Sequence, residues 1–294
     1  MFELQYRETL RRFLLEDLGV EGDVTSKHLG LGNREAAASV VARESGTVAG
    51  LIFVEALFKE LSPHCEVKTR VEEGTDFDAG ASLLLLTGPA RAILAGERTA
   101  LNLLSRTFGI ATEVRRLVNL LDGTDCKLLP TRKTLPGLRL FDKYAAEVGG
   151  AARHRYSLND AIMLKDNHLA LGGTMEEILR STRESAGHML VIEIEVDTLD
   201  QLRRLLEADR RLMDLQPRSR GVDVVLLDNM TRTELTEAVS LLRAHPRTVL
   251  CEASGGIKAE NLREVAGTGV DFVSMGALTH SVMPVDLGLD FLAS

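Results

Sequence analysis

The sequence predicts an α/β protein in which a parallel barrel, closed or nearly closed, follows a smaller N-terminal α+β domain. From about residue 125, a short apolar run and an amphipathic stretch of helical period alternate six times. This alternation is typical of βα units in a parallel sheet. Before residue 110, turns separate the apolar runs and the alternation is absent. We therefore assign residues 1–110 to the first domain and 111–279 to the barrel, and we allow residues 280–294 to return to the first domain.

In the first domain, the helical period predicts helices over residues 2–15 and 53–61. Short apolar runs bounded by turn residues predict strands over 37–42, 46–52, 65–71 and 81–88. Residues 97–121 are expected to form one long helix that joins the two domains, because apolar side chains recur near one of its faces.

In the barrel, the predicted strands are residues 126–130, 161–164, 190–196, 222–227, 248–251 and 270–275. The predicted helices between them are residues 138–148, 175–186, 199–209, 232–243 and 259–267. The charged stretch 207–221 is interpreted as a long surface connection between a helix and a strand.

The composition excludes several classes of function. Of the 294 residues, 45% are hydrophobic and 27% are charged, which is typical of a globular protein. The formal net charge of −8 argues against a nucleic-acid or anionic-membrane partner. The first twenty residues contain no apolar signal-peptide core, and no apolar run is long enough to span a membrane. Three widely separated cysteines (Cys65, Cys126 and Cys251) favour buried thiols in a reducing compartment. We expect a cytoplasmic protein.

Basic side chains gather where the first two barrel strands end. They fall within 34 residues of one another: Arg132, Lys133, His154, Arg155 and Lys165. In parallel barrels, reactive groups lie at the carboxyl ends of the strands, and arginine and lysine suit carboxylate or phosphate oxygens. The cluster therefore predicts a ligand with several negative charges.

Carboxylates follow on later strands. Glu193 and Glu195 alternate with aliphatic residues, so both lie on one face of their strand. Either this face meets cations or a ligand, or the strand is an edge strand with one wet face. Asp228 ends an apolar run, where its carboxylate is suited to a sugar hydroxyl or Mg²⁺.

Glycines mark the ends of the last two predicted strands, in Ser254-Gly255-Gly256 and Gly276-Ala277. Glycine lets backbone N–H groups approach a phosphate, and a following helix N-terminus adds partial positive charge. Turns also need glycine, but phosphate sites on the final strands recur in barrels. The pattern therefore favours a phosphate site.

Several segments together resemble the quinolinate phosphoribosyltransferase family, also called nicotinate-nucleotide pyrophosphorylases. They cover nearly the whole chain in order: residues 16–19, 22–25, 131–137 (TRKTLPG), 149–156 (GGAARHRY), 164–168 (LKDNH), 194–196, 227–230 (LDNM), 252–257 (EASGGI) and 269–279 (GVDFVSMGALT). The combination is highly specific.

The resemblance implies that quinolinate and phosphoribosyl pyrophosphate give nicotinate mononucleotide, pyrophosphate and CO₂, with Mg²⁺, in NAD biosynthesis. It also implies an N-terminal sandwich, an incomplete barrel, and a homodimer or a hexamer built from dimers with shared active sites. Arg132, His154, Arg155 and Lys165 would hold the quinolinate carboxylates, with Arg98 reaching in from a neighbouring subunit. Lys133, Glu195 and Asp228 would be catalytic and serve the pyrophosphate, the ribose and the metal, the last through Glu195 and Asp228, partly by way of water and substrate. The remaining expected substrate-binding residues are Thr131 and, for the 5′-phosphate, Ser254, Gly255, Gly256, Met275, Gly276 and Ala277.

Two departures from the family pattern stand out: Leu135 replaces a common threonine, and Arg153 replaces a common asparagine or serine. Two alternatives remain open. One is a related protein of the same fold associated with molybdenum transport, against which residues 165–168 and 228–230 speak. The other is a non-catalytic barrel that binds a phosphate ligand, which would not require Lys133, Glu195 and Asp228 together.

Overall fold

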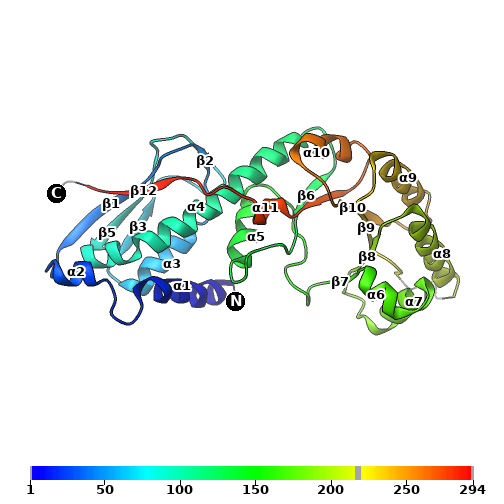
Figure 1. The fold of residues 1–294 in the computed structure, drawn as a ribbon, viewed down its shortest axis with the longest axis horizontal. Coiled ribbons are helices and arrows are strands. Elements are labelled where there is room, and N and C mark those ends of the chain that lie inside the picture. Colours follow the sequence, from blue (N-terminus) through cyan, green and yellow to red (C-terminus); the bar gives the residue numbers. More distant parts are fainter. Residues whose placement is uncertain (1, 216–219, 293–294) are drawn as a thin grey trace. The chain divides into compact units, whose positions relative to one another are not determined.

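The computed structural model describes residues 2–215 and 220–292, and the chain forms two compact units, which are described separately (Figure 1). The N-terminal unit comprises Met1–Arg116, Lys133–Gly150 and Ala277–Ser294, and the barrel unit comprises Leu117–Arg132 and Ala151–Gly276. Two of the three segments of the N-terminal unit thus come from beyond residue 110.

The N-terminal unit contains an antiparallel sheet in the order β12-β1-β5-β3. Its strands are β1 (Glu35–Ala42), β3 (Glu66–Thr69), β5 (Ser82–Pro89) and β12 (Leu287–Phe291). In Figure 1 the red strand β12 lies beside the blue strand β1, and Ala38 pairs with Phe291 on one side and with Leu86 on the other. The last described strand therefore completes a sheet that begins near the start of the chain.

Helices and a small two-stranded sheet complete this unit: α1 (Phe2–Leu18), α2 (Val24–His28), β2 (Gly46–Thr47), α3 (Leu51–Leu61), β4 (Asp76–Phe77), α5 (Arg139–Val148), α11 (Ala277–His280) and the first part of α4 (Ala90–Leu120). The predicted strand over 46–52 is wrong beyond Thr47. Gly50 takes a left-handed conformation with φ of 102°, which turns the chain into helix α3. The apolar run alone fits either element.

One arginine joins the three segments of the N-terminal unit. Arg106 on α4 donates from Nε and Nη2 to the two carboxylate oxygens of Asp142 on α5, at 2.7 and 2.9 Å. The same Nη2 also donates to the carbonyl oxygen of Thr279 on α11, at 2.9 Å. Asp142 is fully buried, and a buried carboxylate needs such charged hydrogen bonds.

The barrel unit contains six parallel strands in the order β6-β11-β10-β9-β8-β7. They are β6 (Lys127–Pro130), β7 (Ile162–Leu164), β8 (Ile192–Val196), β9 (Val224–Asp228), β10 (Leu250–Ser254) and β11 (Phe272–Met275). β6 and β7 are the two ends of this order, so the barrel is incomplete, as the resemblance implied. The N–H of Ala152 donates to the carbonyl of Leu128, which places Ala152 beside the open edge of β6, two residues before His154.

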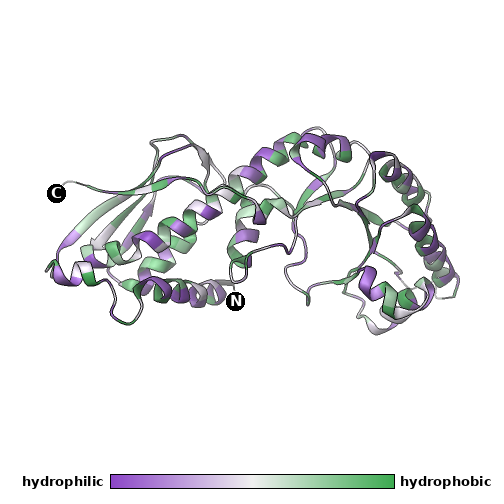
Figure 2. Cartoon of the chain, viewed as in Figure 1, coloured by the Kyte–Doolittle hydropathy of each residue, from purple (hydrophilic) through white to green (hydrophobic). Residues whose placement is uncertain are grey.

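Helices cover the outer face of the sheet: α6 (Asp166–Gly172), α7 (Met175–Ser185), α8 (Leu199–Leu215), α9 (Arg232–Arg243) and α10 (Ala259–Ala266). Figure 2 shows both hydrophobic and hydrophilic residues on α8 and α9, and Leu202, Leu205 and Leu212 are among the buried residues of α8. Their helical spacing carries α8 beyond the predicted end at Asp209. The predicted surface connection over 207–221 is therefore helical to Leu215, and residues 216–219 lie outside the described residues.

Two composition-based predictions can be compared with the structure. Cys65, Cys126 and Cys251 are buried free thiols, as predicted, and burial raises the pKa of Cys126 and of Cys251 to about 12. Within residues 2–215 and 220–292, no helix combines the length and the apolar character needed to cross a membrane.

Candidate active site

The inner face of the barrel sheet carries acidic side chains. Glu195 on β8 and Glu252 on β10 both pair with Leu226 of the intervening strand β9, and paired residues in a parallel sheet share a face. Glu193 lies on this face as well, two residues before Glu195. Because β8 lies between β7 and β9, the edge-strand interpretation of these glutamates is wrong. The acids need cations or a ligand instead.

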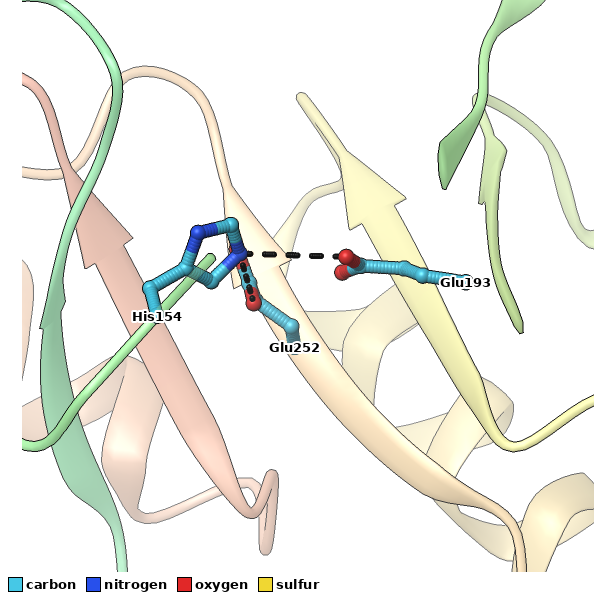
Figure 3. Close-up of side chains that lie close together, drawn as sticks. All are labelled: His154, Glu193 and Glu252. Carbon is cyan, nitrogen blue, oxygen red and sulfur yellow. Dashed lines mark ion pairs between the residues drawn. The ribbon is translucent and has the colours of Figure 1, made fainter. Parts of the chain in front are cut away.

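A histidine reaches two of these acids (Figure 3). The Nε2 atom of His154 lies 3.7 Å from a carboxylate oxygen of Glu193 and 3.4 Å from one of Glu252. The side chains of His154, Glu193 and Glu252 are 12%, 7% and 4% exposed. His154 comes from the segment along β6, so the three residues meet across the inside of the sheet.

This contact determines the charge of the histidine. Burial lowers the pKa of His154, but the carboxylates of Glu193 and Glu252 outweigh burial and raise the pKa from 6.5 to about 9. Burial also raises the pKa of Glu193, and the neighbouring Glu252 adds to that effect. At neutral pH the ring is therefore an imidazolium held between buried acids.

Two arginines belong to the same cluster. Burial, together with the nearby guanidinium of Arg132, lowers the pKa of Arg155, whereas Glu193 and Glu252 act in the opposite direction. The Nη2 of Arg155 lies 3.1 Å from the sulfur of Met163 on β7. Arg132, half-buried, follows the end of β6. The barrel unit thus brings three of the predicted quinolinate-binding residues together.

Lys165 is positioned by a helix start that the sequence pattern did not reveal. It is the N-cap of α6, and its backbone N–H donates to Nδ1 of His168 at 3.0 Å. Its ammonium group is ion-paired with Glu195. Lys165 and Glu195, which were predicted for different substrates, therefore contact each other. His168 helps to fix the start of this helix.

Asp228 ends strand β9 and is followed by an unusual backbone. Burial raises the pKa of Asp228, and the charges of Glu195 and Asp197 raise it further. The Nδ2 of Asn229 donates to Oδ2 of Asp228 at 2.6 Å. Among the described residues, Asn229 is the one non-glycine residue with a positive φ, at 52°. Asparagine tolerates this conformation better than most residues, which explains an asparagine directly after Asp228.

Three carboxylates could hold a cation. Glu195, Asp197 and Asp228 each offer an oxygen, and these oxygens lie within 4.8 Å of one another. Mg²⁺ prefers a few carboxylates together with phosphate oxygens and water, and the repulsion that raises the pKa of Asp228 is what a cation would relieve. The donor set therefore fits Mg²⁺. Asp197 was not among the predicted ligands.

The glycine turn after β10 forms a hollow of about 300 Å³ together with the residues that follow β9. Gly255 has φ of 86°, and a Cβ there would lie 2.3 Å from Oδ1 of Asn229. At Gly256, with φ of 63°, a Cβ would meet nothing within 4 Å. Ser254, Gly255 and Gly256 all line this hollow. The close approach of Asn229 is thus a steric reason for glycine at 255.

The other predicted phosphate-site residues follow β11. Met275 is buried at the end of this strand, paired with Pro130 of β6, and Gly276 comes next in the chain. Thr131, half-buried, lies directly after Pro130. Because β6 and β11 are neighbours, Thr131 and Gly276 follow adjacent strand ends.

The remaining predicted site residues belong to the N-terminal unit. Arg98 is exposed on α4 and lines a hollow of about 440 Å³ with Glu16, Asp17 and other residues. Since α4 begins at Ala90, Arg98 does not lie near a helix N-terminus, contrary to expectation. Lys133 is exposed and its carbonyl accepts a hydrogen bond from Thr279 Oγ1 at 2.8 Å. Ala277 begins α11.

The barrel unit thus combines an incomplete parallel sheet with cations, carboxylates and a glycine turn at its strand ends, an arrangement typical of enzymes that act on small molecules. The family model described as the N-terminal domain of quinolinate phosphoribosyl transferase matches residues 23–108, and the model of its C-terminal domain matches residues 110–290. The chain belongs to the quinolinate phosphoribosyl transferase family.

Individual relatives agree with this assignment. The chain is 39% identical to a probable nicotinate-nucleotide pyrophosphorylase [carboxylating] of Bacillus subtilis, over 100% of this chain and 96% of the relative. It is 37% identical to the human nicotinate-nucleotide pyrophosphorylase [carboxylating], over 87% and 82%. The solved structure of the nicotinate-nucleotide pyrophosphorylase from Francisella tularensis superposes with a TM-score of 0.87 at 32% identity, covering 98% and 96%.

Four residues of the site were missing from the predicted set. Glu193 was noticed on its strand face without a role, and Glu252, Asp197 and Asn229 were not considered individually. Glu252 and Ser254 alternate with the apolar Cys251 and Ala253, and this alternation could have placed Glu252 on the inner face.

The histidine predicts how stability depends on pH. Because the folded-state pKa of His154 is raised from 6.5 to about 9, its contribution to stability is fully present below pH 6.5 and is lost as pH rises through 9. The contribution is at most about 3 kcal/mol. Urea unfolding at pH 6.5 and 9.5 should show a larger loss for the wild type than for His154→Asn. Equal losses in the two proteins would contradict this assignment.

Proposed function

We propose that this protein transfers the phosphoribosyl group of phosphoribosyl pyrophosphate to quinolinate, with decarboxylation, to give nicotinate mononucleotide, pyrophosphate and CO₂ in NAD biosynthesis. The observation that carries the proposal is the side-by-side arrangement of a cationic and an anionic group in the barrel unit of a chain of this family. Arg132, His154 and Arg155 form the cationic group, and the carboxylates around Glu195 and Asp228 form the anionic one.

The cationic group is suited to quinolinate, which carries two carboxylates on adjacent ring carbons. Guanidinium groups match the geometry of a carboxylate, and an imidazolium adds a further charged donor. We assign Arg132, His154 and Arg155 to these carboxylates. We assign Lys165 to these carboxylates as well, and its ion pair with Glu195 supports a role between the two substrates.

The anionic group is suited to the ribose and to a hydrated cation. Glu195 and Asp228, with Asp197 nearby, would hold Mg²⁺ partly through water and substrate oxygens, and the cation would neutralise charge on the pyrophosphate. Lys133 is assigned to the pyrophosphate. Further substrate contacts are assigned to Thr131 and, for the 5′-phosphate, to Ser254, Gly255, Gly256, Met275, Gly276 and Ala277.

The proposed chemistry requires no protein nucleophile. The ring nitrogen of quinolinate attacks C1 of the ribose while the bond from C1 to the pyrophosphate oxygen breaks. Positive charge develops on the ribose, as in other glycosyl transfers, and the carboxylates of Glu195 and Asp228 would stabilise it. Holding both substrates in line supplies much of the acceleration.

Decarboxylation follows on the same ring. The bond between the ring and its 2-carboxylate breaks, CO₂ leaves, and the electron pair stays on the ring carbon, where the pyridinium charge stabilises it. A proton then replaces the carboxylate. The cationic group keeps the ring in place during this step. We assign the proton transfer to no particular residue.

We further propose a homodimer, or a hexamer built from dimers, in which Arg98 of one subunit enters the quinolinate site of another. The exposure of Arg98 on α4 is compatible with a contact to a partner. We propose a cytoplasmic location, in line with the acidic composition and the unpaired cysteines.

A direct assay tests the function. Purified protein with quinolinate, phosphoribosyl pyrophosphate and Mg²⁺ should release one CO₂ for each nicotinate mononucleotide formed, with neither product when any one component is left out. Binding of the phosphate ligand without turnover would favour the non-catalytic barrel. Inertness toward quinolinate would favour the protein associated with molybdenum transport.

The two carboxylates should act on turnover rather than on quinolinate binding. Glu195→Gln and Asp228→Asn should each lower kcat by about 10²-fold, because they act on ribose and metal, while quinolinate affinity stays within a few-fold. Steady-state kinetics and calorimetric titration measure the two effects. Asp200→Asn, an exposed acid on α8 paired with Arg204, is the control and should behave as wild type. Wild-type turnover in the double amide variant would refute the proposed roles.

Sharing of the site can be tested by complementation. Arg98→Ala and Asp228→Ala should each be nearly inactive, but a mixed dimer would contain one site with both defects and one intact site. Random exchange of equal amounts makes about half of the dimers mixed, so activity should recover to roughly a quarter of wild type. Arg91→Ala, another exposed arginine on α4, is the matched control. If exchange of differently tagged subunits occurs without recovery, Arg98 does not act across subunits.

A further inference from the structure

Two buried acids of the barrel unit take no part in the proposed chemistry. Glu193 on β8 and Glu252 on β10 are less than a tenth exposed, and the roles at ribose and metal fall to Glu195 and Asp228. Both carboxylates nevertheless lie on the inner face of the sheet and are close to the same atom, Nε2 of His154 (Figure 3). Burying two carboxylates so close together is costly unless cations balance them.

The cations that balance them are the ones assigned to quinolinate. His154 contacts both acids. Arg155, on the same segment, is influenced by both acids and by Arg132, which follows β6. The Oε1 of Glu193 has no hydrogen-bond partner among the described residues, so His154 is the ion-pair partner that the described structure gives this carboxylate. The two acids and the three cations thus form one cluster of charged side chains.

The state of the histidine decides whether it can bind a carboxylate. A neutral ring that donates from Nε2 to the acids would present Nδ1 as an acceptor, which repels a substrate carboxylate. A protonated ring carries N–H groups at both nitrogens. Two acids at Nε2 favour the protonated ring, consistent with the pKa of His154 of about 9.

A metal ion is the alternative occupant of these three side chains, because their ligand atoms lie within 4.8 Å of one another. The charges around the three side chains favour the ion pair over a metal, because the guanidinium groups of Arg132 and Arg155 would repel a divalent cation at this place.

We propose that Glu193 and Glu252 are positioning residues that fix the His154 ring and hold it in its cationic form, so that it can donate to a carboxylate of quinolinate. This inference rests on the proposed function for the identity of the substrate. The two acids do not touch the substrate themselves.

The test compares Glu193→Gln, Glu252→Gln and the double variant with wild type. Without the two acids, burial leaves the pKa of His154 below its ordinary value of 6.5, so at pH 8 the variant's ring is charged at least about thirty-fold less often than the wild-type ring. The double variant should therefore bind quinolinate at least about ten-fold more weakly at pH 8. The loss should shrink as the pH falls toward 5, where a larger share of the variant's rings is charged. Affinity for phosphoribosyl pyrophosphate should stay within a few-fold at both pH values.

A second set of variants separates positioning from structural damage. In the His154→Asn background, the same Glu→Gln changes should cause no further loss of quinolinate affinity, because their effect passes through the ring. A loss that is equal at pH 5 and pH 8, or that adds to the loss in His154→Asn, would overturn the proposal. A stoichiometric transition metal in the purified protein that disappears in Glu193→Gln would do the same.

Titration of the His154 ring by NMR gives a readout that does not depend on the substrate. Its signals should report a charged ring through pH 8 in the wild type and titration below the ordinary value of 6.5 in the double variant, where burial is no longer outweighed. If the wild-type ring remains charged but quinolinate does not bind, the proposed function fails and the ion-pair cluster stands. If the wild-type ring is neutral at pH 7.5, the positioning role fails whatever the substrate is.

Discussion

Buried carboxylates inside a parallel sheet constrain everything around them. Glu193, Glu195 and Glu252 lie on a face that in many barrels is filled by branched aliphatic side chains, and here cations must reach them. They can do so because the sheet is open between β6 and β7, where Ala152 bonds to the free edge of β6 and His154 follows two residues later. The incomplete barrel is thus coupled to the charge balance of its interior.

The same constraint separates two kinds of acid on one strand. Glu193 lies deeper and meets a histidine, whereas Glu195, two residues nearer the strand end, meets the partly exposed Lys165. Asp228 ends the neighbouring strand β9, and the charges of Glu195 and Asp197 help to raise its pKa. The deep acid thus pairs with a buried cation, and the acid at the rim pairs with a more exposed one. Because residues two apart on a strand share a face, Glu193 and Glu195 face the same side and differ in their depth along the strand.

Much of the fold follows from the sequence because its pattern is local. The six strands of the barrel were predicted within a few residues, and so were the helices between them except α6, which was not predicted, and the end of α8, since apolar runs and helical spacing are both read over short windows. The failures have physical causes. The run over 46–52 fits strand or helix, and its outcome depends on the backbone at Gly50. The end of α8 was placed too early because charged residues hid the buried Leu212.

The site was predictable in its composition but not in its contacts. Basic and acidic residues at strand ends could be identified from their positions in the sequence. That His154 meets Glu193 and Glu252, or that Lys165 meets Glu195, depends on strand order and on where the barrel opens, which no local pattern encodes. Asn229 is a similar case, because its importance lies in a backbone conformation and in its approach to Gly255.

The pairing of β12 with β1 has a consequence for the chain as it is being made. Strand β1 leaves the ribosome early, but its partner Leu287–Phe291 comes only after all the barrel strands. At 5–20 residues per second, β1 waits on the order of tens of seconds as the unpaired edge of a three-stranded sheet. Exposed edge strands pair readily with other chains. The nascent protein is therefore most exposed to misassembly at a strand that the finished fold covers on both sides.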